Sequence, residues 1–154
     1  LDASIQEYVR RRYNVAIGER TAEEIKIQVG SALYLPERMT IEVTGRDMIQ
    51  GLPKTITVTS HDVTEAIQNA LEQMVNTIKE VLHNTPPELS ADVMEKGMVV
   101  SGGTSQLRNL PDLFSEATGV PCMMAEEPAL CVAKGTGVAL ENLESYKRSI
   151  LASK

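Results

Sequence analysis

The chain has 154 residues, of which 42% are hydrophobic and 23% charged, a composition typical of a folded domain with an apolar core. Its formal net charge of −6 excludes a general nucleic-acid-binding surface, because such a surface needs an excess of Lys and Arg to displace counterions from phosphates. No apolar run approaches the roughly 20 residues that a membrane-spanning helix needs, and nothing at the start resembles a signal peptide.

The two cysteines, Cys122 and Cys131, have no further Cys or His near them that would complete a zinc site. A core of this size does not require a disulfide, so we expect both to be buried, reduced thiols in a cytoplasmic protein. The chain starts at Leu1, without an initiator Met, directly in a helical pattern. We therefore expect the sequence to be a piece of a longer protein.

The first part of the chain predicts two helices. Residues 2–13 form the first, with apolar side chains at helical spacing, namely Ile5, Tyr8 and Val9. Thr21-Ala22-Glu23-Glu24 has the sequence of a capping box, so we expect the second helix to begin at Thr21. One face of that helix is apolar and comprises Ile25, Val29 and either Ala32 or Leu33, and Pro36 ends the region.

The pattern then changes from helical to alternating. Residues 40–44 and 55–59 alternate β-branched and polar side chains, which predicts an antiparallel pair of strands with one buried face. Ser60 and Asp62 both offer oxygens that could cap the next helix. From Val63 onward the apolar residues recur at helical spacing over a long amphipathic helix, which Asn84 and the following two prolines end.

The C-terminal third predicts a short acidic helix near residues 88–95 and then a strand–helix–strand–helix unit. The four predicted elements are the strand Met98–Ser101, the helix Gln106–Thr118, the strand Cys122–Ala125 and the helix Pro128–Leu143. Because both strands are apolar throughout, we expect them to be parallel and covered on both faces by helices, in a right-handed connection. The methionines Met94, Met98, Met123 and Met124 then fill the core. Gly135 and Gly137 indicate close packing of the last helix.

Gly102-Gly103 follows the first of these strands, at the carboxyl end where α/β sheets bind their ligands. Without a Cβ, a glycine backbone can approach a ring or a phosphate closely. Thr104 and Ser105 could hydrogen-bond a ligand, or could instead cap the next helix. A simple turn followed by a helix cap explains the same four residues, so the glycines alone do not establish a site.

Glu23 and Lys26 are candidates to hold a purine base and a ribose, because they lie in adjacent turns of one predicted helix. A surface ion pair between residues three apart on a helix is the alternative, and such a pair stabilises a helix by only about 0.2–0.5 kcal/mol.

Four stretches together resemble the MreB/Mbl family of bacterial actin-like cell-shape proteins. They are LDASIQEYVRRRYNVAIGERTAEEIK (1–26), GRDMIQGLPKTI (45–56), TPPELSADVMEKGMVVSGG (85–103) and TGVPCMMAEEPALCVAKGTGVALEN (118–142). The resemblance implies an α/β fold, the second half of an actin-like, ribonuclease H-like ATPase with a nucleotide cleft. Residues 1–13 and 61–144 would form its inner βαβα subdomain, residues 14–60 a small α+β peripheral insertion, and residues 145–154 a flexible tail.

The resemblance also implies a site for ATP. The family segment that matches Glu23, Glu24, Ile25 and Lys26 lines the adenosine pocket, and the glycine loop that matches Gly102, Gly103, Thr104 and Ser105 borders the adenine, the ribose and the α-phosphate. The family has a third glycine and an Ala where this chain has Thr104 and Ser105, whereas actin has a similar Ser-Gly-Gly-Thr run.

The superfamily's two Asp-x-Gly phosphate loops do not occur in this sequence. The resemblance therefore implies that the ligands for Mg²⁺ and the acid that positions the attacking water lie in another lobe, and that this chain alone does not hydrolyse ATP. The family's membrane-inserting segment would also lie in that lobe, so we expect no direct membrane segment here. Implied partners are further copies in a filament, a RodZ-like adaptor and the wall-synthesis machinery at the cytoplasmic membrane.

Two other functions are considered beside this one. An Hsp70-type chaperone or a sugar kinase would share the fold, but the stretches PPELSAD and EEPALCVAKGTG argue against both. A non-catalytic interaction module is the other alternative. If neighbouring strands are missing from the sheet, the strands near residues 98–101 and 122–125 keep an unpaired apolar edge, which predicts self-association or a partly molten inner subdomain.

Overall fold

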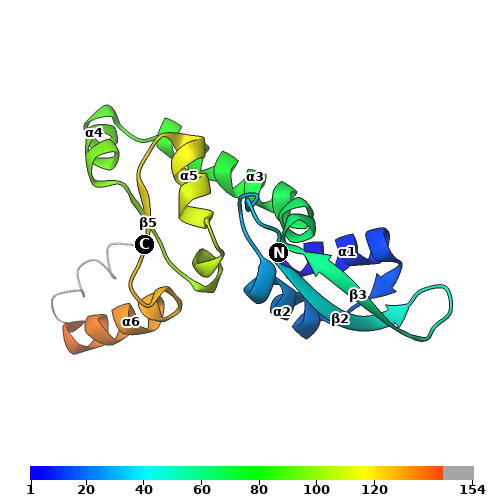
Figure 1. The fold of residues 1–154 in the computed structure, drawn as a ribbon. Helices are drawn as coiled ribbons and strands as arrows, with labels where there is room; N and C mark the ends of the chain where they lie inside the picture. Colours follow the sequence, from blue (N-terminus) through cyan, green and yellow to red (C-terminus); the bar gives the residue numbers. More distant parts are fainter. Residues whose placement is uncertain (144–154) are drawn as a thin grey trace.

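The computed structural model describes residues 1–143, and the expected tail at residues 145–154 lies outside this range. Its strands form a three-stranded sheet and a two-stranded sheet, and helices pack beside both (Figure 1). The helices are α1 (Asp2–Tyr13), α2 (Glu19–Val29), α3 (Ser60–His83), α4 (Pro87–Lys96), α5 (Leu110–Thr118) and α6 (Cys131–Glu141), with short 3-10 turns η1 (Gly103–Gln106) and η2 (Pro128–Leu130). The strands are β1 (Val15–Ala16), β2 (Thr40–Asp47), β3 (Pro53–Thr59), β4 (Met98–Val100) and β5 (Cys122–Met124).

The predicted antiparallel pair is confirmed as β2 and β3, to which β1 adds a third strand in the order β1-β2-β3. Val43 lies opposite Ile56 and Ile41 opposite Val58, so the alternating residues fall on one face. Val43, Ile56 and Val58 are buried on that face, against the helices.

The main core lies between α1, α2, α3 and this sheet (Figure 1). It contains Ile5 and Val9 of α1, Ala22, Ile25 and Val29 of α2, and Val63, Ile67 and Leu71 of α3. Each set recurs at three or four residues, which is the spacing of one helix face. Burial of these aliphatic side chains is the largest stabilising contribution to this half of the molecule.

The capping box predicted at Thr21 is wrong. α2 begins two residues earlier, at Glu19, with Gly18 as its N-cap and no side-chain cap. The helix also ends at Val29, so Ala32 is buried outside it, where its N–H donates to the carbonyl of Arg108 at 2.8 Å. Ala32 is thus held by a tertiary backbone hydrogen bond, and not by the helix that the spacing predicted.

A capping box does exist at α3, but its cap is Thr59 instead of Ser60 or Asp62. The hydroxyl of Thr59 accepts the N–H of Asp62 at 3.2 Å, and the Asp62 carboxylate accepts the N–H of Thr59 at 2.9 Å. The long helix itself is confirmed, but only its first half is buried. Val81, near its end, is 62% exposed.

The strand–helix–strand–helix order of the last third is confirmed, and β4 pairs with β5 in parallel. The helix expected from Gln106 begins at Leu110, because η1 occupies Gly103–Gln106 and Asn109 has a left-handed φ of 59°. Gly119 caps this helix in the left-handed conformation, as helix-ending glycines commonly do.

The expected burial of this sheet on both faces is wrong within residues 1–143. Val99 is 64% exposed, and Met94, Met123 and Met124 are about half exposed, so these methionines do not fill a core. α6 has no buried residue, and nothing lies within 4 Å of a Cβ built at Gly135 or Gly137. Cys122 and Cys131 are free thiols of intermediate exposure, and burial raises the pKa of Cys122.

Candidate functional site

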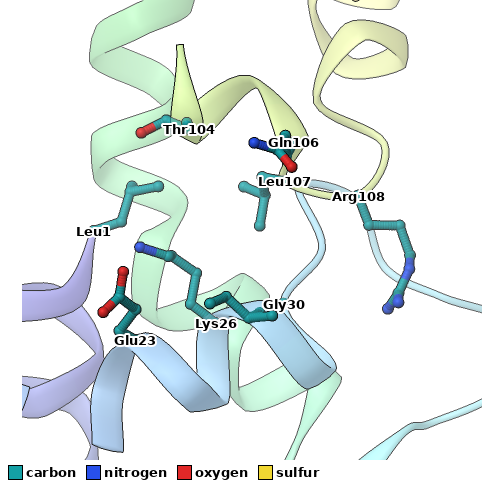
Figure 2. Close-up of a pocket in the computed structure, with 10 residues that line it drawn as sticks. Leu1, Glu23, Lys26, Gly30, Thr104, Gln106, Leu107 and Arg108 are labelled. Carbon is teal, nitrogen blue, oxygen red and sulfur yellow. The ribbon is translucent and has the colours of Figure 1, made fainter. Parts of the chain in front are cut away.

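A hollow of about 740 Å³ lies between the end of α2 and the loop that follows β4 (Figure 2). Its volume lies within the range of about 300–1,000 Å³ that is common for small-molecule sites. The start of α1, two turns of α2 and the η1 region supply its walls. The lining residues are Leu1, Glu23, Lys26, Ile27, Gly30, Gly103, Thr104, Gln106, Leu107 and Arg108.

The sequence of α2 explains why it presents polar groups to this hollow. Its apolar stripe of Ala22, Ile25 and Val29 is buried against α1 and α3, which leaves Glu23, Lys26 and Ile27 on the remaining surface. Ile27 is 69% exposed although it is aliphatic. The wall from α2 therefore combines a carboxylate, an ammonium group and one apolar side chain.

The loop after β4 has a conformation that depends on glycine. Gly102 has a φ of 90°, which side chains rarely tolerate, and its N–H donates to the carbonyl of Pro128 at 2.8 Å. The Ser105 hydroxyl donates to the Gly102 carbonyl at 2.7 Å and is buried. Gly103 and Thr104 then face the hollow, and a Cβ at Gly103 would meet open space.

Ser31 fixes the two walls relative to each other. It forms a parallel β-bridge with Arg108, and its carbonyl accepts the Thr64 hydroxyl at 2.9 Å. The Asn109 side-chain amide donates to the Ser31 hydroxyl at 3.2 Å. Ser31 is fully buried, so these bonds are shielded from water. The hollow is thus preformed.

Gly30 has no room for a side chain. A Cβ at this position would clash with the backbone carbonyl oxygen of Lys26 and lie 3.1 Å from Cδ1 of Leu107. Its φ of −67° is ordinary, so space is the reason for glycine here.

The charge of Lys26 is compensated by α1. Its ammonium nitrogen lies 2.8 Å from Oδ1 and 3.0 Å from Oδ2 of Asp2. The expected alternative, an ion pair between Glu23 and Lys26 along the helix, is not formed. Glu23 stays exposed at the hollow, so its carboxylate is free to accept hydrogen bonds from a ligand (Figure 2).

The candidate residues read from the sequence fall into three groups. Glu23, Lys26, Gly103 and Thr104 line the hollow together, from segments far apart in the chain. Gly102 and Ser105 shape the loop from behind. Ile25 is buried in the core. The exposed Glu24 does not line this hollow but borders an adjoining one on α2, which shares Glu23 and Ile27 with it, and Gln28 donates to Glu24 at 3.2 Å. Ligand binding by these residues stays a prediction.

Other lining residues were not among the sequence candidates. Ile27 carried a signal, since it is an aliphatic residue outside the apolar stripe of α2. Leu1 and Arg108 carried none, because tertiary contacts bring them to the hollow. The Arg108 guanidinium points away from Glu23 and Lys26, and its Nη1 donates to the sulfur of Met39 at 2.9 Å (Figure 2).

Within residues 1–143, no group of three or more His, Cys, Asp and Glu side chains is arranged to hold a metal ion. Within the same range, no helix has both the length and the apolar character to cross a bilayer. A second hollow of about 500 Å³ lies between α3, α5 and residues 32–34, and it is mainly apolar.

Comparisons with known proteins agree with this geometry. A family model described as MreB/Mbl protein matches residues 1–148. The cell shape-determining protein Mbl of Bacillus subtilis is 44% identical over 151 residues, which cover 98% of this chain and 45% of that protein. The cell shape-determining protein MreB of Escherichia coli is 45% identical over 145 residues, 94% of this chain and 42% of that protein. The chain therefore spans less than half the length of these relatives.

Among solved structures, MreB5 of Spiroplasma citri bound to ADP matches with a TM-score of 0.89 and 33% identity. The match covers 96% of this chain and 45% of that chain. It confirms the mixed α/β class and shows that the fold corresponds to part of an actin-like MreB structure.

Proposed function

Because this chain belongs to the MreB/Mbl family, we propose that it is the second lobe of an actin-like, filament-forming protein and holds the adenosine end of ATP. The observation that carries the proposal is a hollow lined by both α2 and the loop after β4. The S. citri relative was solved with ADP and also with AMPPNP, so a nucleotide site belongs to at least one whole protein of this fold.

The chemistry of the hollow fits a nucleoside. Glu23 would accept hydrogen bonds from ribose hydroxyls, and the Thr104 hydroxyl can donate or accept. Ile27 and Leu107 offer apolar contact to a base, and the open space at Gly103 lets the ligand approach the backbone. Bound ATP would supply the phosphates for hydrolysis by the intact protein. This chain's residues bind and orient its sugar and base.

The phosphates and Mg²⁺ are assigned to the other lobe of the longer protein. Glu23 is the carboxylate among the residues that line the hollow, and one carboxylate does not make a magnesium site. That this chain alone does not hydrolyse ATP stays a prediction.

The division into subdomains is part of the same proposal. Residues 1–13 and 61–144 form the inner subdomain of the actin-like, ribonuclease H-like lobe, and residues 14–60 form the peripheral insertion. In support, the antiparallel β2–β3 hairpin extends away from the parallel β4–β5 pair (Figure 1).

Exposed apolar residues at the two ends of the molecule support the proposed filament assembly. The tip of the β2–β3 hairpin and helix α4 lie at opposite ends (Figure 1). The tip exposes Met48, Ile49 and Leu52, and α4 exposes Leu89 and Met94. Two different apolar surfaces at opposite ends suit head-to-tail stacking of copies, which produces open filaments.

For the cellular role, the supporting finding is that the relatives are named cell shape-determining proteins. We propose that the intact protein lies in the cytoplasm, in filaments at the membrane that organise wall synthesis through a RodZ-like adaptor.

Calorimetric titration of this chain with adenosine and with ADP tests the nucleotide proposal. We expect both to bind, and Glu23→Gln to weaken adenosine binding several-fold through loss of a charged acceptor. Glu24→Gln is the matched control, since it removes the same charge one residue away, outside the hollow, and should leave binding unchanged. No heat with either ligand at millimolar concentration favours the interaction module instead.

A further inference from the structure

The ion pair between Asp2 and Lys26 is more protected than ordinary surface pairs. Their side chains are 20% (Lys26) and 31% (Asp2) exposed, compared with 57% and 45% for Arg10 and Glu7 on the outer side of α1. Because water and salt screen partly buried charges less, the Asp2 carboxylate compensates the Lys26 charge more effectively than a surface partner would.

Asp2 influences the charge at the hollow through its contact with Lys26. Oδ2 of Asp2 accepts a hydrogen bond from Lys26, whereas Oδ1 is shut off from solvent and makes a 2.8 Å charge contact without hydrogen-bond alignment. Asp2 itself is not among the lining residues, but Lys26 is. Asp2 therefore acts on a ligand only through Lys26.

Arg108 also lines the hollow, but its guanidinium points away from Glu23 and Lys26 and donates to the sulfur of Met39 (Figure 2). The cation that Asp2 compensates is Lys26. Without Asp2, α1 would no longer compensate the Lys26 charge in this partly enclosed space. An ammonium group is a strong phosphate binder, so that charge would favour the phosphate end of a nucleotide.

We propose that Asp2 is a specificity-determining residue of this hollow. By compensating Lys26, its carboxylate makes the site accept the uncharged nucleoside end of a nucleotide and disfavours entry with the phosphates first. The inference rests on the proposed function and deepens it, because it states what sets the orientation of the ligand.

The test compares adenosine with pyrophosphate by calorimetry on the unchanged chain and on Asp2→Asn. We expect the ratio of the two affinities to shift about tenfold toward pyrophosphate in the variant, the order of magnitude for one unit charge several ångströms from a phosphate at a partly exposed site. Asp2→Glu keeps the charge and should retain the original ratio. Glu7→Gln removes a charge and an ion pair from the same helix, outside the hollow, and should not shift the ratio.

The double variant Asp2→Asn/Lys26→Gln separates specificity from structure. If Asp2 acts through the charge of Lys26, the second substitution returns the ratio to near its original value. An unchanged ratio in Asp2→Asn, or an equal shift in the double variant, would overturn the proposal. Circular dichroism on each protein verifies the fold.

A readout without nucleotide keeps this proposal distinct from the proposed function. Mass spectrometry after brief acetylation should show Lys26 reacting several-fold faster in Asp2→Asn, with Lys54 and Lys79 as internal references. If the unchanged chain binds no adenosine, the proposed function fails. Faster Lys26 acetylation and tighter pyrophosphate binding in Asp2→Asn would still support the charge control by Asp2. Acetylation rates and pyrophosphate affinities equal to those of the unchanged chain would refute it.

Discussion

Tyr13, the last residue of α1, donates a 2.9 Å hydrogen bond to Oδ2 of Asp62 in the first turn of α3. Tyr8 donates to Oδ1 of the same carboxylate at 3.2 Å, and Thr59 donates through both its N–H and its hydroxyl. One side chain thus completes the cap of α3 and fastens α1 to it. Since both helices pack against α2, this contact supports the wall of the candidate site.

Replacing Asp62 by Ala should destabilise the chain by about 2–3 kcal/mol, the combined effect of a lost N-cap partner and of the Tyr13 hydroxyl left without its acceptor, whereas Tyr8 keeps its bond to Glu65. Urea unfolding followed by circular dichroism measures this. Glu65→Ala is the matched control, since the exposed Glu65 accepts only one hydrogen bond, from Tyr8 at 2.7 Å. Equal losses in the two variants would show that the carboxylate of Asp62 has no special role.

The same carboxylate predicts sensitivity to acid. Burial raises the pKa of Asp62, but hydrogen bonds from Thr59, Tyr13 and Tyr8 together outweigh burial and hold it below the ordinary value of 3.8. A lowered pKa contributes stability above pH 3.8 that is lost as the pH falls further. Between pH 5 and pH 3, the urea midpoint of the unchanged chain should therefore fall more steeply than that of Asp62→Asn.

The two tyrosines predict a loss of stability at high pH. Burial and the hydrogen bond to Asp62 raise the pKa of Tyr13 to about 12, and burial with the Glu65 hydrogen bond also raises that of Tyr8. A raised pKa contributes stability below pH 10 that is lost as the pH rises toward 12. Tyr13→Phe should be less stable at pH 8 and should lose less on going to pH 11. Parallel pH profiles would contradict this.

Periodic segments were the ones that the sequence predicted well. The hairpin of β2 and β3 and the long helix α3 were predicted because their apolar residues repeat with one clear period over many residues. The start of α2 was missed because Gly18 caps it without a side chain, while Thr21 offered a more typical cap. The start of α5 was also missed. Asn109, the residue before this helix, has a left-handed conformation and a hydrogen bond to the distant Ser31.

The candidate site was predictable only in part, for a similar reason. The family resemblance implied a binding role for Glu23, Lys26, Gly103 and Thr104, whereas it implied none for Leu1 and Arg108, which join the hollow through tertiary contacts. The exposure of Val99 and Met123 could not be read from their apolar character, since burial depends on neighbours beyond a two-stranded sheet.

This exposed sheet predicts self-association. β4 and β5 pair only with each other within residues 1–143, and Val99 and Met123 expose apolar surface beside unpaired strand edges. Sedimentation velocity should show mass increasing with concentration, and Val99→Thr combined with Met123→Gln should reduce it. A sharp monomer at all concentrations, with slow amide exchange in both strands, would contradict the prediction.

Gly103→Ala distinguishes a ligand contact from a simple turn. No atom lies within 4 Å of the added Cβ, so stability should change by less than about 0.5 kcal/mol. If the ligand passes close to this backbone, adenosine affinity should fall about tenfold or more, because the methyl group occupies its place. Gly30→Ala serves as a contrast, because its clash with Lys26 should lower stability as well. Unchanged affinity in Gly103→Ala would mean that the glycine serves the turn alone.

The central claim is that the hollow between α2 and the loop after β4 holds a nucleoside. Titration of the isotope-labelled chain with adenosine, followed by two-dimensional NMR of the backbone amides, tests it most directly. We predict saturable shifts at Gly30, Gly103, Thr104 and Arg108, with the hairpin-tip amide of Ile49 unmoved. Shifts confined to the hollow between α3 and α5, or no shifts at millimolar adenosine, would contradict the claim.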